Sequence, residues 1–245
     1  MNTNPTPENK SQPDAATAGI GLKAILRFII YIFLMPLALF LSAGTLDWVN
    51  AWILFGFTII TTLASRLIVL RVHPDLLGER ARYAEAEDAK GWDRLIVAVA
   101  AIYGPLVVWI VAGLDWRFGW TSPMPLSWQI AAMVVILLGY GVGIWAMAVN
   151  RFFSAVVRIQ TDRGHTTVTT GPYRFVRHPS YIGGLLAYLA IPVFLESIWA
   201  LVPVSISVIL TIVRTALEDR TLLAELEGYR DYAQRVRYRL IPGIW

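Results

Sequence analysis

The sequence contains no cysteine and only three histidines among its 245 residues, and charged side chains are scarce at 16%. The absence of cysteine excludes disulfide bonds, thiolate metal sites and cysteine nucleophiles. With His73, His165 and His178 as the full set of imidazoles, no metal site is predicted. Soluble globular proteins carry about 25% charged residues, so the low charge content is atypical of a soluble fold.

Hydrophobic residues make up 56% of the chain, and the mean hydropathy is +0.56. Because this exceeds what one soluble core buries, the composition predicts a protein that has lipid as part of its solvent. A helix needs roughly 20 apolar residues to cross a bilayer. The predicted spans cover residues 24–43, 50–70, 94–113, 128–149, 180–195 and 198–217. The last two flank Glu196 and Ser197, which predicts a tight helical hairpin.

The positive charges follow a topological pattern. Nineteen of the 21 lysines and arginines lie within residues 1–27, 71–94, 150–179 and 214–239. The opposite connections, 44–49, 114–127 and 196–197, contain only Arg117. Since cytoplasmic loops are enriched in Lys and Arg, six spans with both termini in the cytoplasm are predicted. The net charge of +4 is too small to argue for a nucleic-acid partner.

Three regions follow from this pattern. Residues 1–22 are polar, lack apolar periodicity and are predicted to be a disordered tail. Residues 23–149 form a predicted four-helix transmembrane region. Residues 150–245 hold a polar loop, the helical hairpin and a C-terminal amphipathic helix. The expected fold is therefore an all-α, polytopic integral membrane protein with a cytoplasmic cofactor pocket in its last third.

The loop before the fifth span collects polar and aromatic side chains. Gly171-Pro172 predicts a turn, and Pro179 suits the first turn of a helix entering the membrane. The amides of such a turn have no partner in the chain and hold negative or polar ligand groups. His178 and Tyr181, three residues apart, are placed to border one ligand. The alternative is that these residues bind no ligand and only lie at the membrane interface, where aromatic residues and arginine are enriched.

Arg214 and Glu218 lie one turn apart near the end of the last span. One interpretation is an ion pair between them that closes the helix at the headgroups. The other is a functional site, because ionisable groups at the edge of a span usually mark one. Beyond them, apolar residues at helical spacing over 222–236 predict an amphipathic helix that lies on the membrane or over the loop. Residues 237–245 are expected to form an interfacial anchor.

The run Gly171-Pro-Tyr-Arg-Phe-Val-Arg-His-Pro-Ser-Tyr-Ile-Gly183, followed by Glu218 and Tyr229-x-x-Tyr232, resembles the isoprenylcysteine carboxyl methyltransferase family. Related membrane phospholipid methyltransferases share the pattern. The resemblance covers about residues 150–245. Two departures occur: Glu218 is followed by Asp219 where the family usually has a second glutamate, and the family's Phe-Gly before the first tyrosine is replaced by Leu226-Glu227-Gly228.

The resemblance implies methyl transfer from S-adenosylmethionine by an enzyme. By family analogy the acceptor-facing catalytic residue is Arg214, and Glu218 holds a polar group of the cofactor. The other implied cofactor residues come from the loop and the start of the fifth span: Gln160, His165, Thr166, Thr167, Val168, Tyr173, His178, Pro179, Ser180 and Tyr181. Arg214 would suit a bidentate clamp for a carboxylate acceptor.

The acceptor is expected to be a lipophilic small molecule or lipidated group that arrives from the bilayer, so that membrane lipids are the surrounding partners. A carboxylate, as in isoprenylcysteine carboxyl methylation, is the leading expectation. A phospholipid amine or a thiol are the alternative acceptors. A non-enzymatic membrane transporter or assembly factor is the alternative of a different class. Transporters usually show two corresponding halves with charges at mid-membrane, and neither pattern occurs in this sequence.

Overall fold

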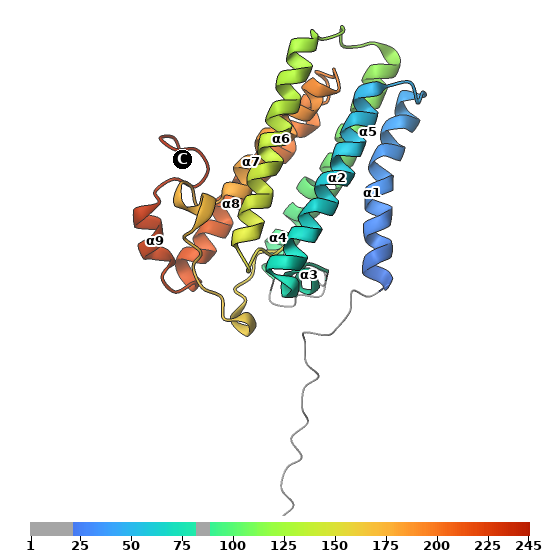
Figure 1. The fold of residues 1–245 in the computed structure, drawn as a ribbon. Coiled ribbons are helices and arrows are strands. Elements are labelled where there is room, and N and C mark those ends of the chain that lie inside the picture. Colours follow the sequence, from blue (N-terminus) through green and yellow to red (C-terminus); the bar gives the residue numbers. More distant parts are fainter. Residues whose placement is uncertain (1–21, 82–88) are drawn as a thin grey trace, which may run out of the picture.

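The computed structural model describes residues 22–81 and 89–245, and within these ranges the chain contains helices and no β-strand. The all-α prediction is thereby confirmed for the described part. Leu22 already belongs to the first helix, and the rest of the predicted tail lies outside the described residues. Figure 1 shows long helices side by side, with the short helices and the C-terminus gathered toward one end. We call the end with the short helices and the C-terminus the loop end, and we call the opposite end the hairpin end.

Four segments in the described part are long and apolar enough to cross a membrane: α2 (Val49–Val72), the continuous helix Gly91–Phe118, α6 (Leu126–Val149) and α8 (Leu201–Glu225). Two helices at predicted spans, α1 (Leu22–Ala43) and α7 (Pro179–Phe194), are present, but the apolar stretch of α1, Ile32–Ala43, and the whole of α7, at 16 residues, are shorter than the four long segments. Large apolar side chains such as Leu138 and Ile209 face outward, at 65% and 60% exposure. This surface belongs in lipid, and the protein is a multi-pass membrane protein.

The third long segment is not uniform. It consists of α4 (Gly91–Val97), a π-helical turn (η2, Ala98–Tyr103) and α5 (Gly104–Phe118). Pro105 has no amide hydrogen, so the carbonyl four residues earlier loses its α-helical donor and the helix widens there. Gly104 follows the turn and lies against Ser207 of α8, with no room for a Cβ atom. The wide turn thus lets α5 and α8 approach closely.

The tightest helix contact joins α6 to α7. Gly139 and Gly183 face each other, and a Cβ atom on either would collide with the other's carbonyl oxygen. At Gly143, one turn further along α6, an added Cβ atom would meet nothing within 4 Å, and the residue borders a cavity instead. Of these two glycines in α6, only Gly139 is therefore required by contact between the helices.

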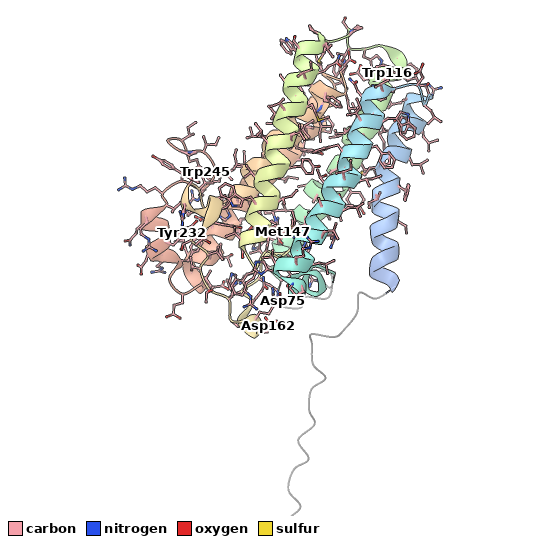
Figure 2. All side chains as sticks on the ribbon, in the orientation of Figure 1. Asp75, Trp116, Met147, Asp162, Tyr232 and Trp245 are labelled. Atoms are coloured by element: carbon pink, nitrogen blue, oxygen red, sulfur yellow. The ribbon has the colours of Figure 1, made fainter. Side chains whose placement is uncertain are left out.

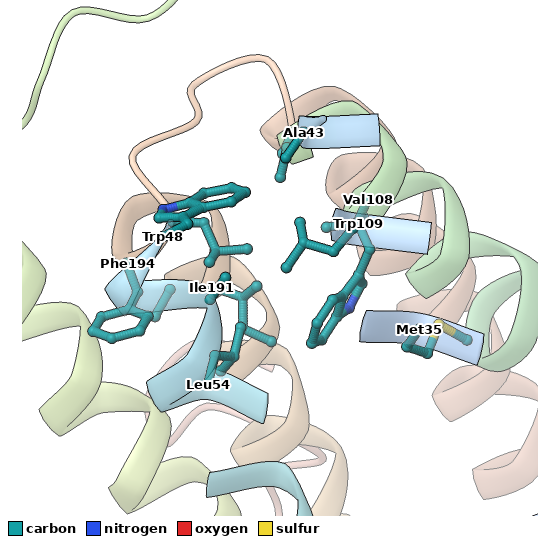
Figure 3. Close-up of a cluster of buried hydrophobic side chains, with 14 of the residues drawn as sticks. Met35, Ala43, Trp48, Leu54, Val108, Trp109, Ile191 and Phe194 are labelled. Carbon is teal, nitrogen blue, oxygen red and sulfur yellow. The ribbon is translucent and has the colours of Figure 1, made fainter. Parts of the chain in front are cut away.

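An apolar cluster fills the half of the bundle toward the hairpin end (Figure 3). It draws side chains from α1, α2, α5 and α7, among them Met35, Leu54, Trp109 and Ile191. Trp48, at 2% exposure, stacks on Trp116 with ring centroids 4.5 Å apart. The cluster holds the first spans to the hairpin.

The predicted hairpin is confirmed: α7 ends at Phe194 and α8 begins at Leu201. Buried Asp115, at the end of α5, stabilises the turn by accepting hydrogen bonds from the Ser197 hydroxyl (2.6 Å) and from the amide and hydroxyl of Thr121 (both 2.7 Å). One buried carboxylate thus connects the third long segment to the hairpin.

The C-terminal segment differs from the prediction. The expected single amphipathic helix over 222–236 is two helices, because α8 continues to Glu225 and α9 (Tyr229–Arg235) begins after Gly228 at φ 75°. Residues 237–245, for which an interfacial anchor is expected, begin by packing back on the loop. The Arg177 and His178 amides donate to the Tyr238 and Arg239 carbonyls, at 2.9 Å each.

The α6–α7 contact generates a stability prediction. Gly139→Ala places a methyl group against the backbone of α7, and we expect a loss of roughly 1–3 kcal/mol from overpacking. Gly141→Ala, on the same helix but with open space around it, should be neutral or slightly stabilising. Thermal unfolding of both variants in a mild detergent measures the difference, and equal midpoints would contradict the contact.

Candidate functional site

Two cavities meet inside the molecule. The loop cavity, of about 330 Å³, lies between the 150–178 loop, the start of α7 and the region from α8 to α9. The helix cavity, of about 540 Å³, lies among α2, η2, α6, α7 and α8. Both volumes fall in the range of roughly 300–1,000 Å³ typical of small-molecule sites. Seven residues line both cavities and form their junction: Arg80, Val97, Ala101, Phe153, Ser180, Tyr181 and Arg214.

His165 is held in the loop as a neutral ring. A single 3-10 turn (η3, Thr161–Arg163) and Gly164 in the left-handed region reverse the chain so that the His165 Nδ1 accepts from the Gln160 amide at 3.3 Å. The imidazole lies against the Phe152 ring, with centroids 4.5 Å apart. Burial, and then the positive charges of Arg163 and Arg158, lower the pKa of His165 from 6.5 to about 4. An acceptor nitrogen therefore persists at neutral pH.

Gln160 is buried behind the loop and lines neither cavity. Its side chain is fully buried, its amide donates to the Phe152 carbonyl at 2.7 Å, and its oxygen accepts from Arg163. The structure thus places Gln160 behind His165.

The other loop residues predicted for the cofactor border the cavity from one side. Thr166, Thr167 and Val168 line it in sequence, and the Thr167 hydroxyl donates to the Glu227 carbonyl at 3.0 Å. Tyr173, in the turn η4 (Gly171–Arg174), accepts a hydrogen bond from Asn150 at 3.1 Å. Burial raises the pKa of Tyr173 above its usual value, so its phenol stays protonated.

The start of α7 brings the motif residues together. Pro179 occupies the first helical position, is buried and lies outside both cavity linings. The rings of His178 and Tyr181 stack with centroids 5.7 Å apart, and both border the loop cavity. The Tyr181 hydroxyl donates to the Glu218 carboxylate at 2.5 Å. This bond links the α7 motif directly to α8.

Asp219 is fully buried and connects four segments of the chain. Its carboxylate accepts from Arg177 (3.0 Å), Arg239 (2.8 Å) and the Tyr229 hydroxyl (2.9 Å), and it lies 3.3 Å from the His178 Nε2. Burial and the neighbouring carboxylate raise the pKa of Tyr229, so it remains a donor. Asp219, which stands where the family usually has a second glutamate, therefore holds α9 and the C-terminal tail over the site.

Arg214 pairs with a residue that no motif indicated. Its Nε and Nη2 donate to the two oxygens of Asp93 in α4, at 2.6 and 3.1 Å, and Nη2 also reaches the Ala155 carbonyl. Asp93 has no exposed surface and accepts from the Val157 amide at 2.7 Å. Of the two interpretations given for Arg214 and Glu218, the ion pair between them is not formed, because each side chain has a different partner.

Further ion pairs hold the segment between α2 and α4 to the loop. In α3 (Pro74–Ala81), Glu79 pairs with Arg158 at 2.9 Å and Asp75 with Arg163 at 2.6 Å. Lys90 pairs with Glu225 at 2.7 Å. Figure 2 shows Asp75 and Asp162 at the loop end and Trp116 at the opposite end. Charged contacts thus concentrate at one end of the bundle.

Ten of the twelve residues predicted from the sequence border the loop cavity, and Gln160 and Pro179 do not. The sequence analysis missed several others that do. Leu222, Leu226 and Tyr229 carried a signal, since their helical spacing predicted an apolar face that lies on the membrane or over the loop, and the structure has it over the loop. Arg80, which borders the cavity, and Asp93, which pairs with Arg214, carried none, because they lie more than 60 residues from the motif.

Comparison with known proteins places the motif in context. Residues 128–226, which comprise α6, the loop, α7 and α8, match the phospholipid methyltransferase family model. The predicted resemblance to membrane methyltransferases is confirmed over this segment. We call residues 128–226 the methyltransferase-family segment. It includes Tyr181, Arg214 and Glu218 and leaves out Arg80 and Asp93.

Two curated proteins are similar over part of their length. The cobalt-zinc-cadmium resistance protein CzcN of Cupriavidus metallidurans is 28% identical over 142 residues, which cover 55% of this chain and 59% of CzcN. The delta(14)-sterol reductase TM7SF2 of Mus musculus is 26% identical over 160 residues, 59% of this chain and 38% of the reductase. The match therefore spans about three-fifths of one relative and under two-fifths of the other.

Among solved structures, the chain is similar to the eukaryotic intramembrane Ras methyltransferase ICMT, an isoprenylcysteine carboxyl methyltransferase. The two share 18% identity, and the TM-score is 0.48 over 92% of this chain and 88% of the other.

The neutral imidazole of His165 predicts a pH effect on stability. Unfolding exposes the ring and returns its pKa to about 6.5, so the unfolded chain binds more protons between pH 6.5 and 4. The free energy of unfolding is not reduced by protonation of His165 above pH 6.5, and it falls as the pH is lowered from 6.5 to about 4. We expect His165→Gln to remove up to about 3 kcal/mol of the acid-side loss. Denaturant unfolding of wild type and His165→Gln at pH 7 and pH 4.5 tests this. An equal drop in the free energy of unfolding between the two pH values in both proteins would count against it.

The Asp93–Arg214 pair predicts strong energetic coupling between the third and last long segments. Asp93→Asn leaves Arg214 without its buried counter-charge, and we expect a loss of about 3–5 kcal/mol. The double variant Asp93→Asn/Arg214→Gln should lose clearly less than the sum of the two single variants. Chemical unfolding of all four proteins measures the coupling, and additive losses would argue against a direct pair.

Proposed function

We propose that the protein is an integral membrane methyltransferase that moves a methyl group from S-adenosylmethionine to a lipophilic acceptor bearing a carboxylate. The observation that carries the proposal is the meeting of the two cavities at Ser180, Tyr181 and Arg214. The loop cavity has the polar and aromatic lining that a nucleotide-like cofactor needs. The helix cavity has the depth and apolar lining for a lipid chain. A transfer between two such ligands requires their reacting ends to meet, as these cavities do.

The residues of the loop cavity fit S-adenosylmethionine. Arg177 lines it, and its buried Nε has no hydrogen-bond partner within the described ranges, so a ligand carboxylate or a water is needed there. Glu218 offers a carboxylate to an ammonium or ribose hydroxyl. Phe152, Leu226 and Tyr229 supply apolar surface for a purine. When bound, the cofactor supplies a methyl group activated by a positively charged sulfur.

The chain's contribution would be orientation and the exclusion of water. A sulfonium and a carboxylate react to give two neutral products, so the reaction is favoured where little water must reorganise. Tyr181 and Arg214 lie at the junction, Tyr181 fixed by Glu218 and Arg214 by Asp93. The Nε–Nη2 edge of Arg214 is engaged by Asp93. Its role toward an acceptor is therefore a single contact through Nη1, in place of the bidentate clamp expected from the sequence.

The concentration of arginine at the loop end supports an orientation with the loop cavity and both termini in the cytoplasm. A lipophilic acceptor would then enter the helix cavity from the membrane while the cofactor enters from the aqueous side. The six-span topology, with α1 and α7 as complete crossings, belongs to the same proposal.

A phospholipid amine is the second candidate acceptor, favoured by the family whose model matches residues 128–226. An amine must lose a proton on methylation, and Glu218, hydrogen-bonded to Tyr181 at the junction, offers a carboxylate to accept it. Methyl transfer from radiolabelled cofactor separates the candidates, since a methyl ester is released by mild base and a methylamine is not.

Glu218→Gln tests the cofactor site directly. Removing the carboxylate charge beside Tyr181 should weaken S-adenosylmethionine binding about tenfold or more, since charged hydrogen bonds contribute roughly 1.5–3 kcal/mol. Glu225→Gln, two turns further along α8 and paired with Lys90 outside the cavity, is the matched control and should bind like wild type.

Calorimetric titration of the detergent-purified proteins gives the dissociation constants. Equal affinity in wild type and Glu218→Gln would remove Glu218 from the site. A folded, monodisperse wild type that does not bind the cofactor would overturn the proposed function.

A further inference from the structure

Arg80 occupies an unusual position for a cation. It lies near the end of α3, outside the methyltransferase-family segment, yet it lines both the loop cavity and the helix cavity. Its Nη1 reaches the Phe153 carbonyl only at 3.4 Å, and its guanidinium lies 5.4 Å from the centre of the Phe153 ring. Within residues 22–81 and 89–245, no carboxylate pairs with it. The guanidinium of Arg80 therefore lies at the junction of the two cavities, and it donates to no carboxylate of the described residues.

Other arginines around the site are neutralised. Arg158 pairs with Glu79, Arg163 with Asp75, Arg177 with Asp219 and Arg214 with Asp93, all at 3.0 Å or less. A partly buried guanidinium without an anion is unfavourable, because burial removes the water that would otherwise stabilise the charge. The contrast singles out Arg80 as a cation at the junction whose charge no carboxylate of the described residues balances.

The local electrostatics agree with this geometry. Burial, and then the positive charges of Arg66 and Arg214, lower the pKa of Arg80 to about 10. The side chain therefore remains charged at neutral pH, in a region of positive potential. An anion at the junction would relieve that repulsion and would also meet the Nη1 of Arg214, which has no hydrogen-bond partner in the described part of the chain.

We propose that Arg80 binds the carboxylate of the acceptor while the acceptor's apolar chain occupies the helix cavity. This inference rests on the proposed function and deepens it by naming the recognition group and the substrate class, a long-chain carboxylate. The cavity beyond Arg80 is bordered by Gly143, Gly184 and Leu185, and it leaves space for an extended chain among α2, α6, α7 and α8. Asp93 neutralises Arg214, and Arg80 is left to attract the substrate.

The test measures ligand binding by the full-length protein in a neutral detergent, with quenching of tryptophan fluorescence or calorimetry as the readout. Three 16-carbon probes differ only in their heads: palmitate, hexadecyl phosphate and hexadecanol. We expect Arg80→Gln to weaken palmitate binding at least tenfold and leave hexadecanol binding unchanged. Arg80→Lys should retain intermediate affinity for palmitate, because it keeps the charge and loses the planar fork.

The matched control is Arg71→Gln, which removes an exposed arginine at the end of α2 that borders neither cavity. Its palmitate affinity should equal that of wild type. Unchanged palmitate affinity in Arg80→Gln, with thermal stability like wild type, would overturn the proposal. A larger loss for hexadecyl phosphate than for palmitate would replace the carboxylate by a phosphate headgroup and equally overturn it.

A parallel titration with S-adenosylmethionine separates this inference from the proposed function. Arg80→Gln should bind the cofactor as wild type does, because its proposed partner is the acceptor. If wild type binds palmitate through Arg80 but does not bind the cofactor, the anion site stands and methyl transfer fails. If the cofactor binds and palmitate binding does not depend on Arg80, methyl transfer stands and the anion site fails.

Discussion

The bidentate contact between Asp93 and Arg214 is the interaction on which the site depends. It lies between the third and last long segments, and the Val157 amide and Ala155 carbonyl bring the loop to the same point. A buried pair of this kind is costly to break, because either partner alone would be an uncompensated charge. It therefore holds the junction of the two cavities in one geometry, and it consumes most of the hydrogen-bonding capacity that Arg214 has for a ligand.

A second buried carboxylate, Asp219, closes the loop side. Through Arg177, Arg239 and Tyr229 it brings the loop, the tail and α9 onto the end of α8. The neighbouring residue, Glu218, turns toward Tyr181 instead. Two adjacent acids on one helix thus serve different purposes: Asp219 fastens the cover, and Glu218 faces the cavity.

Much of the architecture was predictable, because the bilayer imposes a simple constraint. Backbone groups in lipid must be satisfied within the segment, so long apolar runs become helices whatever their neighbours. The hairpin around Glu196 and the clustering of His165, His178 and Tyr181 around one cavity followed from local patterns. The partner of Arg214 did not follow, because helical spacing reports neighbours within one helix, whereas Asp93 comes from another. The amphipathic run 222–236 gave the correct apolar face but left open whether it lies on the membrane or over the loop, and the turn at Gly228 brings the chain back over the loop.

The sequence by itself determined the membrane environment, the helical class and the resemblance of residues 150–245 to a methyltransferase family, since hydropathy, charge asymmetry and motif spacing are local properties. Tertiary structure alone decided which charges are neutralised and which remain available. Asp93, Arg80 and Arg214 are separated by up to 134 positions along the chain, yet they act at one junction. Ion pairing between distant helices depends on how those helices cross, and crossing geometry is set by packing contacts such as Gly139 against Gly183, which no single stretch of sequence specifies.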